Sequence, residues 1–167
     1  RRYGIYAWFG YPLPMPERLH EIASAGFDSV MLWWGDDFSP KDCPKDTHPE
    51  LARREGLFVE NIHAPFQNAG HLWEDTLSGE AVFHCYARGI TDCRRHNIPV
   101  MVIHLTNGRI PPLLSAVGLD RIERLLDLAV RYEVRIALEN VKAPGPVERL
   151  LDRYDSPFLG LCYDAGH

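Results

Sequence analysis

The sequence reads YDAGH at positions 163–167, directly after an apolar run. Positions 136–140, IALEN, have the same form: apolar residues give way abruptly to groups that can hold a metal ion or move a proton. Two earlier segments repeat this form, NIHAP at 61–65 and VIHL at 102–105. We therefore expect four strands that each carry a polar group at the C-terminal end, and we interpret these ends as the active site.

Strand-like and helix-like segments alternate along the whole chain. Strands are predicted near 2–8, 28–34, 57–63, 98–105, 134–138 and 158–163, with helical periodicity near 16–26, 47–55, 79–96, 119–132 and 146–154. The strand ends, from Trp8 to Asp164, cover 156 residues in five steps, or about 31 per step. A (β/α)8 barrel of ~250 residues has nearly the same step.

Alternating strands and helices predict a parallel sheet with helices outside it, which both barrels and open sheets satisfy. Ligands at four successive strand ends favour the barrel, because an open sheet gathers its ligands at one switch point. The fold class is therefore an α/β TIM barrel, apparently incomplete, with about six of eight βα units. We expect residues 1–167 to form a single partial barrel domain whose C-terminal strands are missing or are supplied by another chain, which leaves a homo-oligomer open.

The composition bounds the class of protein. The chain has 167 residues, is 46% hydrophobic and carries a net charge of -5, so it can bury a core and gives no electrostatic reason to expect nucleic acid or an anionic membrane as a partner. No segment approaches the ~20 apolar residues that span a bilayer. Four cysteines without CxxC spacing predict reduced thiols and a cytoplasmic location. A small-molecule substrate is expected.

Five strand-end residues have the side-chain types of metal ligands: His63, His104, Glu139, Asp164 and His167. Carboxylates accept Mg2+ or Mn2+, and added imidazoles move the preference toward Mn2+, Co2+ or Zn2+. The sequence therefore predicts a divalent metal as cofactor, with Mn2+, Zn2+, Co2+ and Mg2+ all open.

The motifs IHAPF at 62–66, VIHL at 102–105, ALEN at 137–140 and YDAGH at 163–167 occur in order at successive predicted strand ends. In this the chain resembles the xylose isomerase-like TIM-barrel superfamily, which includes sugar-phosphate isomerases, ketose 3-epimerases and the endonuclease IV type of abasic-site nuclease. The resemblance runs the whole length of the chain. The family's remaining His and Glu metal ligands lie on later strands that this sequence does not contain.

The resemblance implies a role for each strand-end residue. Glu139 would be a metal ligand and the acid/base at the carbon whose proton moves, and Asp164 would be a second metal ligand. His167 would contact the substrate as a catalytic residue in the epimerase branch, or bind a further zinc in the nuclease branch. His63 and His104 would hold the additional zinc of nuclease-like members, or line the sugar pocket.

These roles predict a metal-dependent isomerase or epimerase acting on a small sugar, sugar phosphate or polyol-derived ketone by proton transfer through an enediolate. A carboxylate beside a cation supplies both the base and the charge that such a reaction needs. One alternative is an endonuclease IV-like, zinc-dependent abasic-site nuclease, against which the negative net charge stands. Another is a non-catalytic fragment that serves as a binding module.

Other residues are candidates for substrate binding. Trp8 and Trp34 could form an apolar wall against a sugar ring, with barrel packing as the alternative. Asn107, Arg109 and Lys142 follow predicted strands and could meet hydroxyls or a phosphate. Simpler interpretations of the ligands also stay open: a structural carboxylate for Glu139, a turn for residues 164–167, and pocket histidines without metal at 63 and 104.

Further expectations concern residues outside the predicted site. Thr47 is expected to cap the helix that follows it, with Glu50 completing a capping box. His71 is expected to be a surface residue. The remaining histidines lie on predicted helices and are expected to face solvent: His20, His48, His84 and His96.

Overall fold

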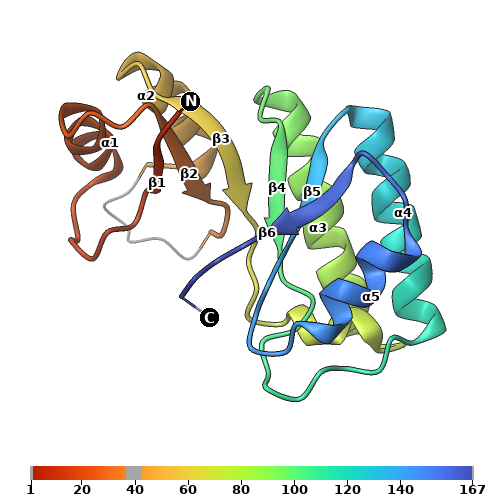
Figure 1. Ribbon diagram of the computed structural model, residues 1–167. Helices are drawn as coiled ribbons and strands as arrows, with labels where there is room; N and C mark the ends of the chain where they lie inside the picture. Colours follow the sequence, from red (N-terminus) through yellow and green to blue (C-terminus); the bar gives the residue numbers. More distant parts are fainter. Residues whose placement is uncertain (1, 37–42, 167) are drawn as a thin grey trace. The chain divides into compact units, whose positions relative to one another are not determined.

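The computed structural model describes residues 2–36 and 43–166. The chain forms two compact units, Arg1–His63 and Ala64–His167 (Figure 1). Strands and helices alternate in both units, and the alternation of six strands with helices that the sequence predicts is confirmed.

The first unit contains three parallel strands in the order β1-β2-β3. Trp34 N donates a hydrogen bond of 2.9 Å to His63 O and so extends the pairing of β2 and β3 beyond the end of β2. In chain order the elements are β1 (Gly4–Tyr6), α1 (Met15–Ser24), β2 (Ser29–Trp33), the 3-10 helix η1 (Lys45–Thr47), α2 (His48–Arg54) and β3 (Phe58–His63).

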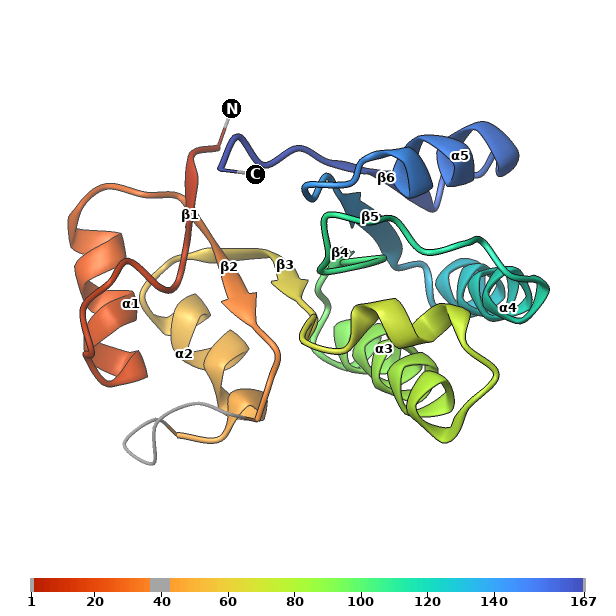
Figure 2. The same ribbon diagram turned by 90° about the horizontal axis from the view of Figure 1, so that it is seen from below.

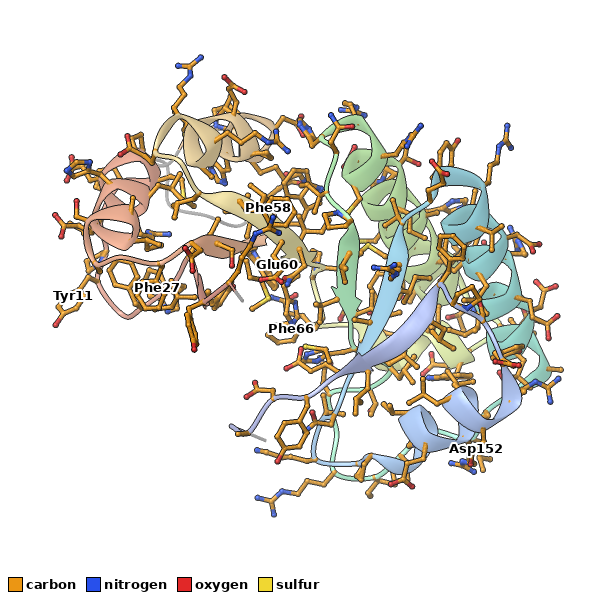
Figure 3. All side chains as sticks on the ribbon, turned by 45° about the horizontal axis from the view of Figure 1, so that its top comes forward. Tyr11, Phe27, Phe58, Glu60, Phe66 and Asp152 are labelled. Atoms are coloured by element: carbon orange, nitrogen blue, oxygen red, sulfur yellow. The ribbon has the colours of Figure 1, made fainter. Side chains whose placement is uncertain are left out.

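A bulge at Glu60 interrupts the pairing of β2 with β3. Val30 pairs with Val59 and Met31 with Asn61, so Glu60 is one extra residue in β3. Figure 3 labels Glu60. The Ser29 hydroxyl donates a 3.0 Å hydrogen bond to the Glu60 carboxylate. Because the register resumes beyond the bulge, the last residues of the two strands, Trp33 and His63, still pair.

The second unit contains three parallel strands in the order β4-β5-β6. Its long helices α3 and α4 pack against each other and against β4 and β5 (Figure 2). In chain order the elements are the 3-10 helix η2 (Ala69–Trp73), α3 (Leu77–Arg95), β4 (Val100–Ile103), α4 (Ala116–Tyr132), β5 (Arg135–Glu139), α5 (Gly145–Arg153) and β6 (Leu159–Cys162).

Local chemistry explains the bounds of these helices. The Thr76 hydroxyl accepts a hydrogen bond from Gly79 N at the start of α3, and the Ser115 hydroxyl accepts one from Gly118 N at the start of α4. Helix α4 ends where Glu133 takes the left-handed conformation, with φ at 57°. Most apolar residues of β4 and β5 are buried, as in strands that are covered on both faces: Met101, Val102, Ile103, Ile136 and Leu138.

Two sequence expectations about the first unit are wrong. His48 is buried, and its ring nitrogen Nε2 lies 2.8 Å from the carbonyl oxygen of Cys43, whereas a solvent-facing residue was expected. The Thr47 hydroxyl does not cap α2, because it donates instead to the carbonyl of Pro44 at 2.7 Å. His20 is exposed as expected.

The other helical histidines lie in the second unit. His84 is exposed as expected, and His96 is half-buried. Over the described residues, no helix is long and apolar enough to cross a membrane.

Candidate active site

The structure brings His104 and Glu139 together. Glu139 is the last residue of β5 and His104 directly follows β4, and these two strands pair in parallel register up to Ile103 and Leu138. The His104 Nε2 atom lies 3.0 Å from Glu139 Oε2, and both side chains are only 6% exposed. A polar contact in such a water-poor environment is stronger than the same contact at the surface.

Phe66 fixes the plane of the His104 ring. The two rings are stacked, with centroids 4.7 Å apart and an interplanar angle of 20°. Figure 3 labels Phe66. The segment that carries Phe66 is itself tied to β4, since Ala64 N donates a 2.9 Å hydrogen bond to Val102 O. The imidazole is therefore held by a ring on its face and by a carboxylate at its edge.

Asp164 lies just beyond β6 and is exposed. Its carboxylate oxygen Oδ1 accepts a 2.7 Å hydrogen bond from Gly166 N. The Asx-type turn that was an alternative for this segment is thus present. One carboxylate oxygen is engaged within the turn itself, and the ligand role of Asp164 stays a prediction.

Asn140 is a site residue that the sequence interpretation missed. Its side-chain amide donates to Asp164 O at 2.9 Å, and its side-chain carbonyl accepts from Asp164 N at 2.6 Å. This reciprocal pair imitates one further rung of the ladder between β5 and β6, and so positions the Asp164 backbone. The available signal was an amide side chain immediately after the ligand in ALEN, because Asn can satisfy a donor and an acceptor together.

Cys162 is the register partner of Glu139 in the β5–β6 pair. Burial, and then the negative charges of Glu139 and Asp164, raise the pKa of the Cys162 thiol to about 11. The thiol is therefore neutral at physiological pH, with burial as the main cause of the shift and the two neighbouring carboxylates as smaller ones.

His63 ends β3 in the first unit. Its side chain is buried, and its ring centroid lies 5.7 Å from that of Trp33. His167 lies outside the described residues. The metal and catalytic roles of both histidines stay predictions.

The two candidate tryptophans have different environments. Trp34 is 3% exposed, and Lys45 Nζ lies 5.9 Å from its ring centroid. Trp8 is 46% exposed, with the Arg18 guanidinium 5.2 Å from its ring centroid. The burial of Trp34 matches the packing alternative, while Trp8 keeps the accessible ring face that a substrate contact requires.

The three loop candidates Asn107, Arg109 and Lys142 are exposed. Asn107 lines a hollow of about 320 Å3 together with His71 and Glu74. His71 is partly exposed, near the surface as expected, and its Nδ1 atom lies 2.8 Å from the Glu74 carboxylate.

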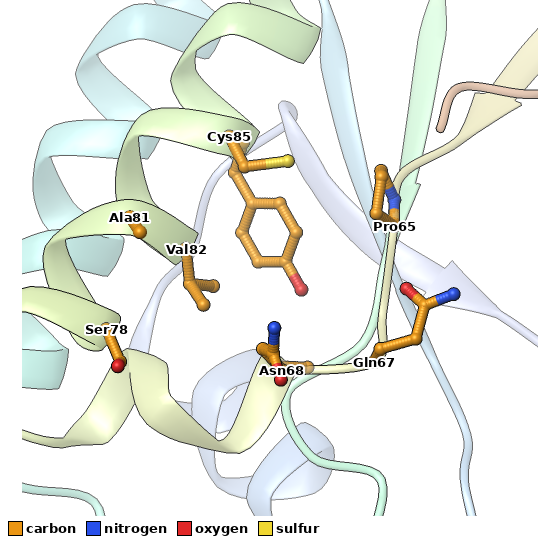
Figure 4. Close-up of a pocket in the computed structure, with 9 residues that line it drawn as sticks. Pro65, Gln67, Asn68, Ser78, Ala81, Val82 and Cys85 are labelled. Atoms are coloured by element: carbon orange, nitrogen blue, oxygen red, sulfur yellow. The ribbon is translucent and has the colours of Figure 1, made fainter. Parts of the chain in front are cut away.

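A second, smaller cavity of about 200 Å3 lies between the segment after β3 and helix α3 (Figure 4). Pro65 and Gln67 line it from the segment, and Val82 and Cys85 from the helix. The sequence predicted no role in a site for any of these four residues.

The donor set at the ends of β4 and β5 fits a divalent cation. An imidazole nitrogen and a carboxylate oxygen converge there within hydrogen-bond distance, and both are shielded from water. Mixed nitrogen and oxygen ligands suit Zn2+, Mn2+ or Co2+. On chemical grounds, His104 and Glu139 have the ligand types of a metal site.

The sequence profile of the xylose isomerase-like TIM barrel family matches residues 19–167. The chain belongs to this family. The α/β fold class is thereby confirmed, and the six strands, parallel within each unit, correspond to an incomplete TIM barrel. None of the curated protein sequences matches this family member significantly.

Solved structures share the fold of this xylose isomerase-like chain. A D-tagatose 3-epimerase-like protein is 21% identical with a TM-score of 0.75, and the alignment covers 100% of this chain and 66% of that one. An L-ribulose 3-epimerase is 16% identical with a TM-score of 0.73, covering 98% and 60%. A D-allulose 3-epimerase from Methylomonas sp. is 18% identical with a TM-score of 0.73, covering 98% and 62%. The chain thus spans less than two thirds of the length of these proteins.

Proposed function

We propose that this family member acts as a metal-dependent isomerase or epimerase on a small sugar, sugar phosphate or polyol-derived ketone. The observation that carries the proposal is the buried contact between His104 and Glu139 at adjacent strand ends. Sugar 3-epimerases among the structures of similar fold support the same reaction class. In TIM-barrel enzymes the C-terminal ends of the strands are where catalysis occurs.

Within this proposal, His104, Glu139 and Asp164 would hold the divalent ion, which could be Mn2+, Zn2+, Co2+ or Mg2+. His63 and His167 are further predicted ligands. When bound, the ion would supply positive charge beside the oxygen of the reacting carbonyl.

Glu139 is the proposed base. Its carboxylate would take the proton from the carbon next to the substrate carbonyl, which gives an enediolate. The contact with His104 fixes the orientation of the carboxylate, and the burial of both side chains limits competition from water. His167 is the second proposed acid/base. Delivery of a proton from His167 to the opposite face of the same carbon would give epimerisation. Delivery of a proton to the neighbouring carbon, with loss of the hydroxyl proton on the first carbon, would give aldose–ketose exchange.

Proton exchange with solvent tests this proposal directly. The chain is first analysed for bound metal, then incubated in D2O with D-fructose, D-tagatose, D-allulose and L-ribulose, separately with Mn2+, Co2+, Zn2+ and Mg2+. We expect deuterium at the carbon beside the carbonyl of at least one ketose. Glu139→Gln is expected to slow this exchange at least about 100-fold, the usual contribution of a positioned base.

The matched control is Glu148→Gln, which removes an exposed carboxylate in the first turn of α5. This variant should exchange at the wild-type rate. Absence of exchange with every ketose and every metal would refute the proposed function, and equal rates for Glu139→Gln and wild type would refute the role of Glu139.

A further inference from the structure

We infer that Tyr86 and Trp73 are positioning residues that set the orientation of His104 from outside the strand ends. The His104 ring contacts Glu139, so a role for this orientation in catalysis rests on the proposed function. The orientation of the ring itself can be measured in the chain without metal or substrate.

Tyr86, from helix α3, holds the backbone of His104. Its side chain is fully buried, and its hydroxyl donates a 2.8 Å hydrogen bond to the carbonyl oxygen of His104. His104 lies just beyond the last residue of β4, and a buried carbonyl requires a hydrogen-bond donor, which the Tyr86 hydroxyl provides. Burial also raises the pKa of Tyr86, which keeps its hydroxyl protonated and able to donate.

Trp73, from η2, holds the next residue. Its indole Nε1 donates a 2.8 Å hydrogen bond to the carbonyl oxygen of Leu105, and both side chains are buried. Two consecutive carbonyls after β4 are therefore each fixed by a side chain from a different element. Together the two bonds hold the path of the chain through His104 and Leu105.

Helix α4 in turn fixes Trp73. The Ser115 hydroxyl, which caps this helix, donates a 2.6 Å hydrogen bond to the backbone carbonyl of Trp73. Gly118, one turn on, lies against the indole so closely that a Cβ atom there would be 2.2 Å from the ring carbon Cε3. Only glycine permits this approach, so the start of α4 is fitted to the indole.

Arg121 fixes the backbone on both sides of Trp73. Its Nη1 atom donates to the carbonyls of Leu72 and Glu74, at 2.8 and 2.7 Å. Its Nη2 atom lies 2.8 Å from the carboxylate of Glu80 on α3, which lowers the pKa of Glu80. Burying a guanidinium that is only 1% exposed costs free energy, and an apolar side chain could fill the same space without that cost. Only the guanidinium can bind the carbonyls of η2, and it thereby holds this segment in one position.

The contacts thus run from α4 through η2 to the residues that follow β4. A role in positioning differs from a role in stability alone, since only the first predicts that loss of one hydroxyl changes the orientation of the His104 ring. The stacked Phe66 ring provides the readout, because its ring current shifts the proton resonances of an imidazole held 4.7 Å away.

The experiment compares Tyr86→Phe with wild type by proton NMR of the histidine ring signals, assigned by their loss in His104→Gln. We expect the His104 ring protons to lose part of their ring-current shift in Tyr86→Phe. The matched control is Tyr154→Phe, which removes a hydroxyl that donates to Glu123 at 2.9 Å on the exposed surface. In the control, the His104 signals should stay in place.

Zn2+ affinity, measured by titration calorimetry on the same variants, gives a second readout. Loss of a residue that orients a metal ligand typically weakens binding 10- to 100-fold, so we expect about a 10-fold loss for Tyr86→Phe and none for Tyr154→Phe. If Tyr86→Phe fails to fold, the same two measurements are made on Trp73→Phe, which removes the hydrogen bond to the carbonyl of Leu105. Unchanged His104 signals together with a lowered melting temperature would overturn the inference and leave Tyr86 a stabilising residue only. A shift of the His104 signals without proton exchange in any ketose would uphold the positioning role and refute the proposed function.

Discussion

Two carboxylates end neighbouring strands of the second unit, and the same sequence pattern predicts both, yet their environments are opposite. Glu139 is 5% exposed and contacts His104, whereas Asp164 is exposed and its carboxylate contacts the backbone of its own turn. The cause is position in the sheet. Strand β5 lies between β4 and β6, while β6 pairs, among the described residues, with β5 alone.

The difference separates two ways of holding a polar group at a strand end. Glu139 is fixed through its side chain, by burial and by His104. Asp164 is fixed through its backbone, by the amide of Asn140, and its side chain stays accessible. Substitutions of Glu139 should therefore lower the free energy of unfolding of the whole unit, whereas substitutions of Asn140 and Asp164 should mainly affect the local backbone after β6.

Glu139→Ala is expected to have the largest effect on folding. It removes the partner of a buried imidazole and leaves a void, which together should lower the free energy of unfolding by about 3 kcal/mol. Urea denaturation followed by circular dichroism measures this change. Glu139→Gln, which keeps the volume and one hydrogen-bonding oxygen, should recover most of the loss. Equal destabilisation by both variants would mean that the carboxylate charge, and not the occupied volume, stabilises this strand end.

Asn140→Ala is expected to have an intermediate effect. It removes two hydrogen bonds to the Asp164 backbone, both partly accessible to water, and should cost about 1 kcal/mol. Hydrogen exchange of the Asp164 amide, measured by NMR, reports the local consequence and should accelerate. Asn140→Asp is the matched control, since it keeps the acceptor for Asp164 N and loses only the donor. An unchanged exchange rate in Asn140→Ala would show that the backbone after Cys162 is held without the hydrogen bonds from the Asn140 side chain.

Asp164→Ala is expected to change the free energy of unfolding by no more than about 0.5 kcal/mol, because the side chain is exposed and its Oδ1 atom accepts a hydrogen bond from its own turn. The same urea denaturation measures it. A loss as large as that of Glu139→Ala would contradict the contrast between the two ends and would indicate that Asp164 stabilises more than its turn.

The parts of this fold that follow from sequence are those set by local periodicity. Alternating strands and helices, and the location of His104 and Glu139 at adjacent strand ends, follow from apolar runs and from the parallel order of a βα repeat. The bounds were less accurate: the apolar run at 98–105 contains a strand of only four residues, Val100–Ile103, because the ladder ends before the apolar residues do.

The parts that sequence did not reveal depend on contacts between distant residues. Tyr86 and His104 are 18 residues apart in the sequence, and Trp73 and Leu105 are 32 apart, so no local sequence pattern predicts either hydrogen bond. The bulge at Glu60 likewise depends on the register of a neighbouring strand. His48 lies on a predicted helix, and no local pattern indicates that its ring is buried with Nε2 2.8 Å from the carbonyl oxygen of Cys43.

The smallest expected effect concerns the Cys162 thiol, whose pKa depends on the charges of both carboxylates. Its pKa is raised to about 11 by burial first, then by Glu139 and then by Asp164, so removal of either negative charge should lower it. The thiolate is the reactive form, and alkylation by iodoacetamide at pH 8.5 should therefore accelerate in Glu139→Gln and, to a smaller extent, in Asp164→Asn. Mass spectrometry of the Cys162 peptide measures the rates, with the buried Cys93 as an internal control that stays unlabelled.

The same shift fixes the sign of a pH dependence. A thiol whose pKa is higher in the folded chain than in the unfolded chain stabilises the fold fully below the unfolded value of about 8.5. This contribution is lost as the pH rises from there through about 11, because the unfolded chain releases the proton first. The stability lost over this pH range should be smaller in Glu139→Gln than in Asp164→Asn, since the buried carboxylate raises the pKa of Cys162 more than the exposed one. The reverse order would show that Asp164, and not Glu139, has the larger electrostatic effect on the Cys162 thiol.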